Sequence, residues 1–249
     1  MALLILTGLC VGLVLGLTGA GGSILAVPLL LLTLDLSLND TIGIALGAVC
    51  AAATIGVLQR WRQRSVDPVV GVMLALSGMA TAPAGRWLGM QIPETLLMTA
   101  FAVLAGFLAW RMWCGSSVPN SRINSKHNVT SSWQLFVIGA GCGLLSGLFG
   151  VGGGFVIVPA LTLLLGMSMQ RAIATSLLVI AMISASGFVF QLSYQKTAVT
   201  PLLLCVVGSV AGITLSTLLA RHIPTEKLQK LFALSVAGLL TATVSKMLS

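Results

Sequence analysis

The sequence predicts an all-α integral membrane protein made of two inverted repeats, each with about five hydrophobic segments. Three observations support this fold class. Of the 249 residues, 57% are hydrophobic and 7% are charged, which leaves too few polar side chains to cover a water-soluble globule. The apolar residues fall into long runs, and a glycine-rich block followed by proline occurs twice.

The glycine-rich block marks an internal repeat. Residues 16–28 read GLTGAGGSILAVP and residues 147–159 read GLFGVGGGFVIVP, so the two prolines lie 159 − 28 = 131 residues apart. The same offset holds without a gap for Gly12 and Gly143, Ser37 and Ser168, Gly56 and Gly187, and Pro93 and Pro224. Matches at one spacing over this length indicate a duplicated unit.

The apolar runs give the expected membrane segments. They cover 2–17, 21–34, 41–59, 68–90 and 94–113 in the first half, and 133–148, 152–165, 172–194, 199–220 and 226–248 in the second. The first basic residue is Arg60, so we expect the first segment to remain as a helix rather than act as a cleaved signal. The second segment of each half is shorter than a crossing. The first two segments of each repeat are therefore expected to be short or re-entrant around the glycine-rich break.

A polar stretch divides the chain into its expected domains. Residues 115–132 are rich in Ser and Asn, as in a flexible linker, and they separate a first transmembrane repeat, 1–114, from a second, 133–249. If each half has five segments, the halves are inverted and the 13 basic residues divide ten against three. The ten are Arg60, Arg62, Arg64, Arg111, Arg122, Lys126, Arg171, Arg221, Lys227 and Lys230.

An alternative topology treats the first two segments of each half as one broken crossing. The basic residues would then divide eight against five. The sharper asymmetry favours inverted repeats with both termini outside and a cytoplasmic linker, because basic residues collect on the cytoplasmic side.

The glycine-rich breaks are the first candidate site. A matched break in both halves is typical of discontinuous helices, and the helix after a break presents unpaired N–H groups and a positive dipole end that bind anions. Two such ends that face each other would form one central anion site. The candidate substrate-binding residues are Thr18, Gly19, Gly21, Gly22 and Ser23, their counterparts Gly150, Gly152, Gly153 and Gly154, and the hydroxyl residues Thr175 and Ser176 of segment 172–194.

Several of these glycine, hydroxyl and arginine residues also have a purely structural interpretation. Gly8, Gly12 and Gly16, with Gly139, Gly143 and Gly147, repeat every four residues and are interpreted as helix-packing faces. Hydroxyl groups within apolar segments also commonly form bonds between helices. Arg86, followed by Trp87, stands where a helix should end and is interpreted as an interfacial anchor.

Other classes of protein are disfavoured. The basic residues form no aromatic-interleaved patch, so the net charge of +8 indicates anionic membrane lipid rather than nucleic acid as a partner. The five cysteines show no metal-ligand spacing, and no cofactor is expected. The two histidines fall in predicted loops, too far in depth from Ser23 to serve as a base, which disfavours an enzyme.

The paired GLTGAGGSILAVP and GLFGVGGGFVIVP motifs resemble those of the sulfite exporter TauE/SafE family of membrane transporters. The resemblance implies transport of a sulfur-containing oxyanion or organosulfonate across the plasma (cell inner) membrane. We expect a secondary transporter with alternating access. A small-anion channel and a carboxylate carrier are the alternatives, and the coupling ion, a proton or another ion, stays open.

Overall fold

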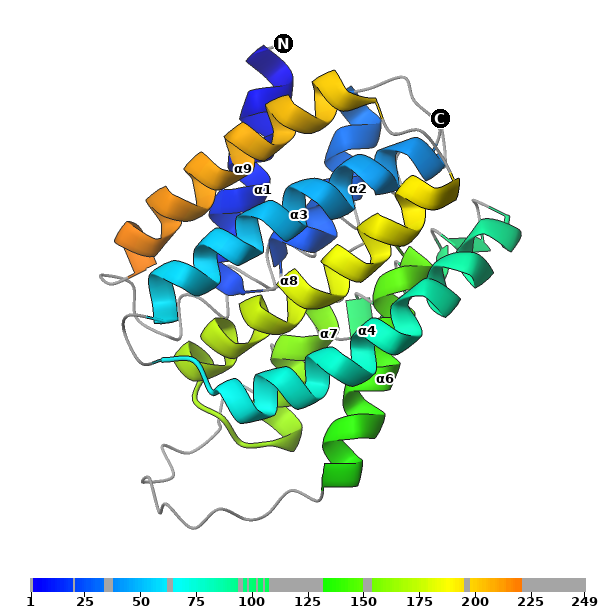
Figure 1. Cartoon of the computed structure of the whole chain (residues 1–249). Helices are drawn as coiled ribbons and strands as arrows, with labels where there is room; N and C mark the ends of the chain where they lie inside the picture. Colours follow the sequence, from blue (N-terminus) through cyan, green and yellow to red (C-terminus); the bar gives the residue numbers. More distant parts are fainter. Residues whose placement is uncertain are drawn as a thin grey trace.

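The computed structural model describes residues 2–19, 21–33, 38–61, 65–93, most of 96–107, 132–149, 154–194 and 198–220. These residues contain helices and no strand (Figure 1). The helices of the first half are α1 (Ala2–Thr18), α2 (Gly21–Thr33), α3 (Leu38–Trp61) and α4 (Pro68–Gln91). Those of the second half are α6 (Ser132–Phe149), α7 (Gly154–Pro159) with the π-helical turn η1 (Ala160–Leu164), α8 (Met169–Tyr194) and α9 (Val199–Ala220).

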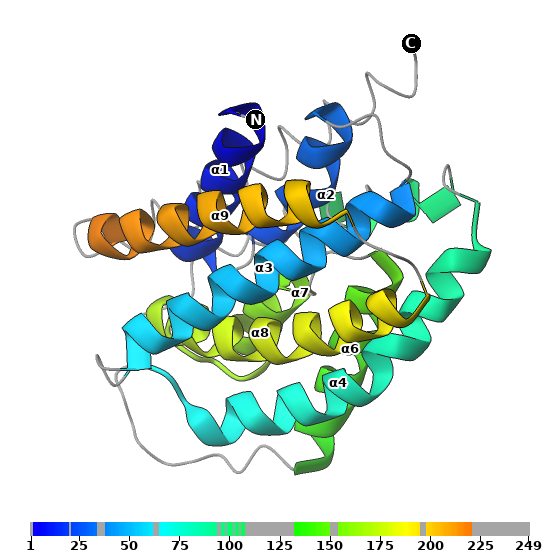
Figure 2. The ribbon, with the colours of Figure 1, turned by 45° about the horizontal axis from the view of Figure 1, so that its top comes forward.

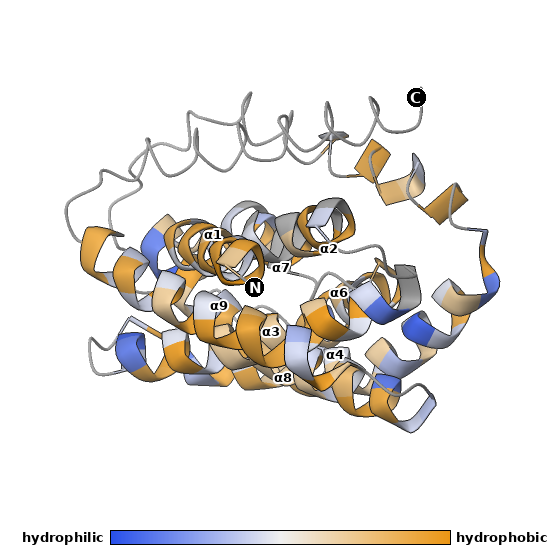
Figure 3. Ribbon diagram, turned by 90° about the horizontal axis from the view of Figure 1, so that it is seen from above, coloured by the Kyte–Doolittle hydropathy of each residue, from blue (hydrophilic) through white to orange (hydrophobic). Residues whose placement is uncertain are grey.

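Four of the described helices are long and apolar enough to cross a membrane: 40–61, 68–91, 169–194 and 199–219. The helices 2–18 and 133–149 are apolar but shorter. Figure 3 shows apolar residues along the helices and hydrophilic residues gathered toward their ends. Large apolar side chains such as Leu58, Val189 and Val207 are exposed, as expected for a surface that faces lipid. The predicted class, an all-α membrane protein, is confirmed.

Corresponding helices of the two halves begin at matching positions. The first residues of α3 and α8, Leu38 and Met169, lie 169 − 38 = 131 residues apart, and those of α4 and α9, Pro68 and Val199, lie 199 − 68 = 131 apart. These two pairs of helices therefore start with similar local signals, such as a proline within the first three positions of α4 and α9.

The helices α3 and α8 lie side by side at the centre and run in opposite directions (Figure 1 and Figure 2). Gly56 near the end of α3 lies against Leu177 near the start of α8, and Gly187 lies against Leu46. Between these contacts, the Cys50 thiol donates to the Ala181 carbonyl at 3.6 Å, and these two positions are 131 residues apart. Counterpart positions thus meet where the two central helices cross.

Each half packs its first helix against the fourth helix of the other half. α1 lies along α9 and α6 lies along α4, at distances that leave no room for side chains. A Cβ atom on Gly12 would lie 2.0 Å from the Ser209 carbonyl oxygen, and one on Gly143 would lie 2.1 Å from the Gly78 carbonyl oxygen. The predicted packing role of this glycine ladder is confirmed.

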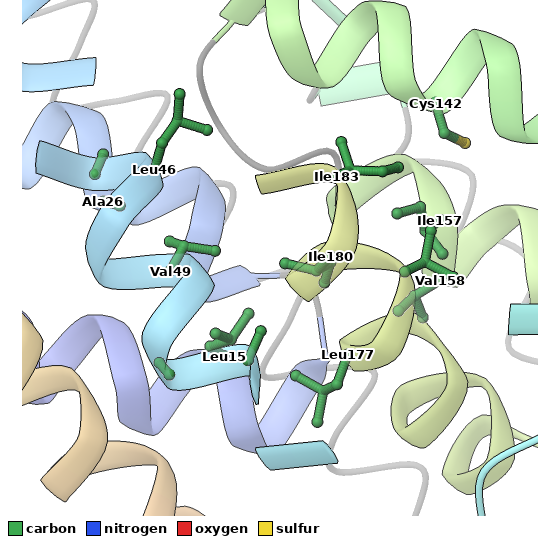
Figure 4. Close-up of a cluster of buried hydrophobic side chains, with 14 of the residues drawn as sticks. Leu15, Ala26, Leu46, Val49, Cys142, Ile157, Val158, Leu177, Ile180 and Ile183 are labelled. Atoms are coloured by element: carbon green, nitrogen blue, oxygen red, sulfur yellow. The ribbon is translucent and has the colours of Figure 1, made fainter. Parts of the chain in front are cut away.

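The apolar core lies between the central helices and the short helices behind them (Figure 4). Counterpart positions occupy it together, for example Leu46 with Leu177 and Val49 with Ile180, all four buried. Cys142 is buried in this core. It behaves there as a small apolar side chain.

Candidate functional site

The first helix break lies between α1 and α2. The α1 helix ends at Thr18, Gly19 adopts a left-handed conformation with φ 71°, and α2 begins at Gly21. The Gly19 N–H donates to the Leu15 carbonyl at 2.7 Å, which closes the last turn of α1. The predicted break is confirmed, and α2 starts at Gly21, the first residue of the predicted segment 21–34. The α2 helix has 13 residues, and its first turn, which carries the positive end of the helix dipole, lies at the break.

The break is held against α8 of the other half. A Cβ atom on Gly19 would lie 2.8 Å from the Ile173 Cα atom and 2.9 Å from the Ser176 Oγ atom. The Ser176 hydroxyl lies 2.9 Å from the Gly19 carbonyl, to which it donates, and it is equally close to the Ile173 carbonyl. Thr18, fully buried, donates to the Val14 carbonyl. Three predicted site residues, from two halves of the chain, therefore meet at the first break.

The first break lies to one side of the molecular centre. Ile173 and Ser176 precede Ala181 by eight and five residues, so the break is displaced from the α3–α8 crossing by roughly 8 to 12 Å along α8. The 17 residues of α1 span about 25 Å, which carries the chain past that point before it turns.

Two other predicted residues face away from the break. A Cβ atom on Gly22 would lie 2.2 Å from the Val11 carbonyl oxygen, so Gly22 is required for the close packing of α2 on α1. The Thr175 hydroxyl accepts a hydrogen bond of 3.0 Å from the Asp67 N–H, and the Asp67 carboxylate accepts one from the Val70 N–H as the N-cap of α4. Thr175 therefore joins α8 to the start of α4.

The remaining predicted residues are described in part or not at all. Gly21 and Ser23 lie in the first turn of α2, and Gly154 is the first residue of α7. Gly150, Gly152 and Gly153 lie outside the described residues, as does the linker 115–132.

Arg86 is not the interfacial anchor that the sequence predicted. Its side chain is fully buried, and its Nε donates to the Gln191 Oε1 of α8 at 2.8 Å, while the neighbouring Trp87 is exposed. The reason is that α4 continues to Gln91, so Arg86 lies inside the helix on the face that packs against α8.

A second buried arginine was not singled out from the sequence. Arg60, in the last turn of α3, is 8% exposed, and its Nη2 donates to the Gly16 carbonyl near the end of α1 at 2.5 Å. Its Nε has no hydrogen-bond partner among the residues that the structure describes. The repeat contained a signal for these positions, because each arginine has a neutral polar residue as its counterpart. Gln191 is the counterpart of Arg60 (191 − 60 = 131), and Thr217 is the counterpart of Arg86 (217 − 86 = 131).

A helical membrane protein with a duplicated set of helices, a break inside the bundle and buried cations belongs to the class of membrane transporters. More particularly, the chain belongs to the sulfite exporter TauE/SafE family, which it matches over residues 4–243. It is 32% identical over 238 residues to a probable membrane transporter protein of Xylella fastidiosa (strain 9a5c), covering 92% of this chain and 89% of that protein. It is 23% identical over 241 residues to the probable membrane transporter protein YdhB of Bacillus subtilis, covering 96% and 98%. No solved structure matches the chain.

Proposed function

We propose that this transporter is a secondary carrier of a small anion, a sulfite-like oxyanion or an organosulfonate, and that it works by alternating access across the plasma membrane. The observation that carries the proposal is the break at Gly19, where α2 begins inside the bundle against Ser176 of the other half. The printed family description, sulfite exporter, supports a sulfur oxyanion as the substrate class.

The break offers an anion two kinds of donor. The first turn of α2 has backbone N–H groups without partners inside the helix, and the helix dipole favours negative charge there. The second kind is the buried hydroxyls of Thr18 and Ser176 beside it, each of which would have to turn away from the carbonyl to which it now donates, Val14 or Gly19, before it could donate to an anion. An oxyanion can accept bonds from such groups without a permanent covalent or metal ligand. By the 131-residue offset, Gly150, Gly152, Gly153 and Gly154 are the proposed counterparts of these groups in the second half.

Alternating access requires two parts that move against each other around the site. The repeats 1–114 and 133–249 are the proposed units, inverted in the membrane and joined by a cytoplasmic linker at 115–132, with both termini outside. The antiparallel packing of α3 and α8 supports this topology, since counterparts that cross in opposite directions fit inverted halves. The alternatives are a channel, whose site would be open to both faces at once, and a carrier of carboxylates.

The purified protein in proteoliposomes tests the proposal directly. We expect saturable uptake of sulfite or methanesulfonate that is accelerated by the same anion inside the vesicles, because a carrier exchanges its substrate across the membrane. Counterflow with acetate alone would support a carboxylate carrier. Unitary currents in planar bilayers would support a channel, and the absence of anion-dependent flux with all three anions would contradict the proposed function.

The topology has its own test. In a variant without native cysteines, a cysteine placed at Ser121 is expected to react with an impermeant maleimide in inside-out vesicles only. Reaction in intact cells would place the linker outside and contradict the proposed orientation.

A further inference from the structure

Two buried arginines lie in two interfaces that are counterparts by the 131-residue offset, α3 with α9 and α8 with α4, although they stand at different positions of the repeat. In one place, position 60 of α3 lies beside α9, on which position 217 is threonine. In the counterpart place, position 191 of α8 faces position 86 of α4. The arginine comes from the central helix in the first place and from the fourth helix in the second. Each of these two interfaces therefore holds one guanidinium, from Arg60 or Arg86, with neutral Thr217 or Gln191 at the counterpart of the other arginine.

Each arginine lies next to the first helix of one half, α1 or α6, at the residue where the glycine-rich motif starts. Arg60 donates to the carbonyl of Gly16, at the start of the motif 16–28. A Cβ atom on Gly147, at the start of the motif 147–159, would lie 2.8 Å from the backbone nitrogen of Arg86. The Arg60 guanidinium is thus bonded to the start of the first motif, and the backbone of Arg86 packs against the start of the second.

The two guanidinium groups lie toward opposite faces of the membrane. Arg60 follows Cys50 by ten residues on α3, and Gln191, which binds Arg86, follows Ala181 by ten residues on the antiparallel α8. Ten helical residues span about 15 Å, so each group lies well to its own side of the crossing. Arginines at the ends of membrane helices normally extend into the headgroup region, but these two are buried in protein.

We propose that Arg60 and Arg86 are a matched pair of anion-binding residues, one on each side of the α3–α8 crossing. This inference rests on the proposed function, since it needs an anionic substrate. A guanidinium has five N–H donors in a planar fork that matches two oxygens of a sulfonate or sulfite. The buried Nε of Arg60 has no described partner, so it can serve a ligand while Nη2 holds Gly16. A buried ionised group in a membrane segment is costly to keep, which favours a role in the substrate path.

The test measures anion affinity separately from stability. Wild type and the variants Arg60→Gln and Arg86→Gln are purified, and thermal-shift titrations with sulfite, thiosulfate, methanesulfonate and acetate give the Kd for each anion. We expect each variant to raise Kd about tenfold or more, because a hydrogen bond to a charged group is lost, and to weaken divalent thiosulfate more than monovalent methanesulfonate. Arg122→Gln, which removes one positive charge from the linker, is the matched control and should leave Kd unchanged.

Two further variants keep the proposal falsifiable if a glutamine variant does not fold. Arg60→Lys preserves the charge and the contact with Gly16 but not the fork, and should raise Kd several-fold. The double variant R86Q/Q191R moves the guanidinium from α4 to the central helix α8, the arrangement that Arg60 has on α3, and should restore most of the affinity. Unchanged Kd values in folded variants, with only the unfolding temperature lowered, would overturn the inference. The arginines would then only stabilise the packing of the helices through their bonds to Gly16 and Gln191. If wild type binds none of the four anions, the result contradicts the proposed function itself rather than the role of the arginines.

Discussion

The interface of α1 with α9 and that of α6 with α4 make the same close backbone approach with different residues. A Cβ atom on Gly212 of α9 would lie 2.2 Å from the Leu9 carbonyl oxygen. The counterpart of Gly212 on α4 is Thr81, whose hydroxyl donates to the Ala140 carbonyl at 2.8 Å, and Ala140 is in turn the counterpart of Leu9. At this position the α1–α9 interface has no room for a side chain, whereas the α4–α6 interface uses the Thr81 hydroxyl for a hydrogen bond between the helices.

One turn further along, the difference is reversed. A Cβ atom on Gly85 of α4 would lie 2.1 Å from the Leu144 carbonyl oxygen, whereas the counterpart position on α9 is Ser216. The halves thus preserve the close contact without preserving which residue provides it. The buried arginines follow the same rule, since the guanidinium comes from the central helix α3 in the α3–α9 interface and from the fourth helix α4 in the α8–α4 interface.

The largest loss of stability is expected at Gly12 and Gly143, counterpart glycines that lie against a backbone carbonyl in both interfaces. Gly12→Leu and Gly143→Leu each place a side chain against a backbone carbonyl that cannot move aside. We expect neither variant to give monodisperse protein in detergent. Overpacking typically lowers the free energy of unfolding by about 1–3 kcal/mol, and it costs more where the obstacle is backbone. Gly141→Leu is the control, since a Cβ atom there meets nothing within 4 Å. Normal yields of all three proteins would contradict this account of the interfaces.

A smaller loss is expected at the helix break. Gly19→Ala combines a left-handed backbone conformation with a contact of 2.8 Å to the Ile173 Cα atom, whereas Gly166→Ala has a similar φ of 63° and open space. The left-handed conformation alone costs an L-residue about 1–2 kcal/mol. We expect Gly166→Ala to lower the unfolding free energy by about that amount with anion flux retained, and Gly19→Ala to lower it further and stop flux. Equal flux in the two variants would show that the contact of Gly19 with α8 is unimportant.

The comparison of the two interfaces is sharpened by Gly212→Ala. This variant adds one methyl group against the Leu9 carbonyl and should destabilise the protein by about 1–3 kcal/mol in SDS-titration unfolding. Thr81→Ala, at the counterpart position, leaves the backbone contact intact and serves as the control. If Gly212→Ala were as stable as wild type, the α1–α9 interface would be looser than the contacts indicate.

The smallest effect is expected from removal of the hydrogen bond between α4 and α6. Thr81→Val keeps the shape of the side chain but loses the bond to the Ala140 carbonyl, and bonds of this kind in membrane helices contribute about 0.6 kcal/mol on average. The same SDS titration measures it. A loss above about 2 kcal/mol would mean that Thr81 does more than join two helices.

Local sequence signals determined the helices and the first break. Apolar runs and glycine act over a few residues, so segment 21–34 appears as α2, 21–33, and segment 68–90 as α4, 68–91. The starts of α3 and α8 were placed three residues too late. The reason is that both helices begin in polar residues, including Asp40 and Arg171, where hydropathy is low although the helix has already formed.

The sequence by itself thus determined the membrane class, the family motif, the 131-residue repeat and the place where α1 ends. Only the tertiary structure decided which residues meet: Ser176 rather than Thr175 contacts the break, Gly22 faces α1, and Arg60 and Arg86 are buried rather than interfacial. The physical reason is that helices of this kind are apolar on all sides, so no periodic polar stripe marks the face that will be buried. That face is chosen by neighbours from the other half of the chain.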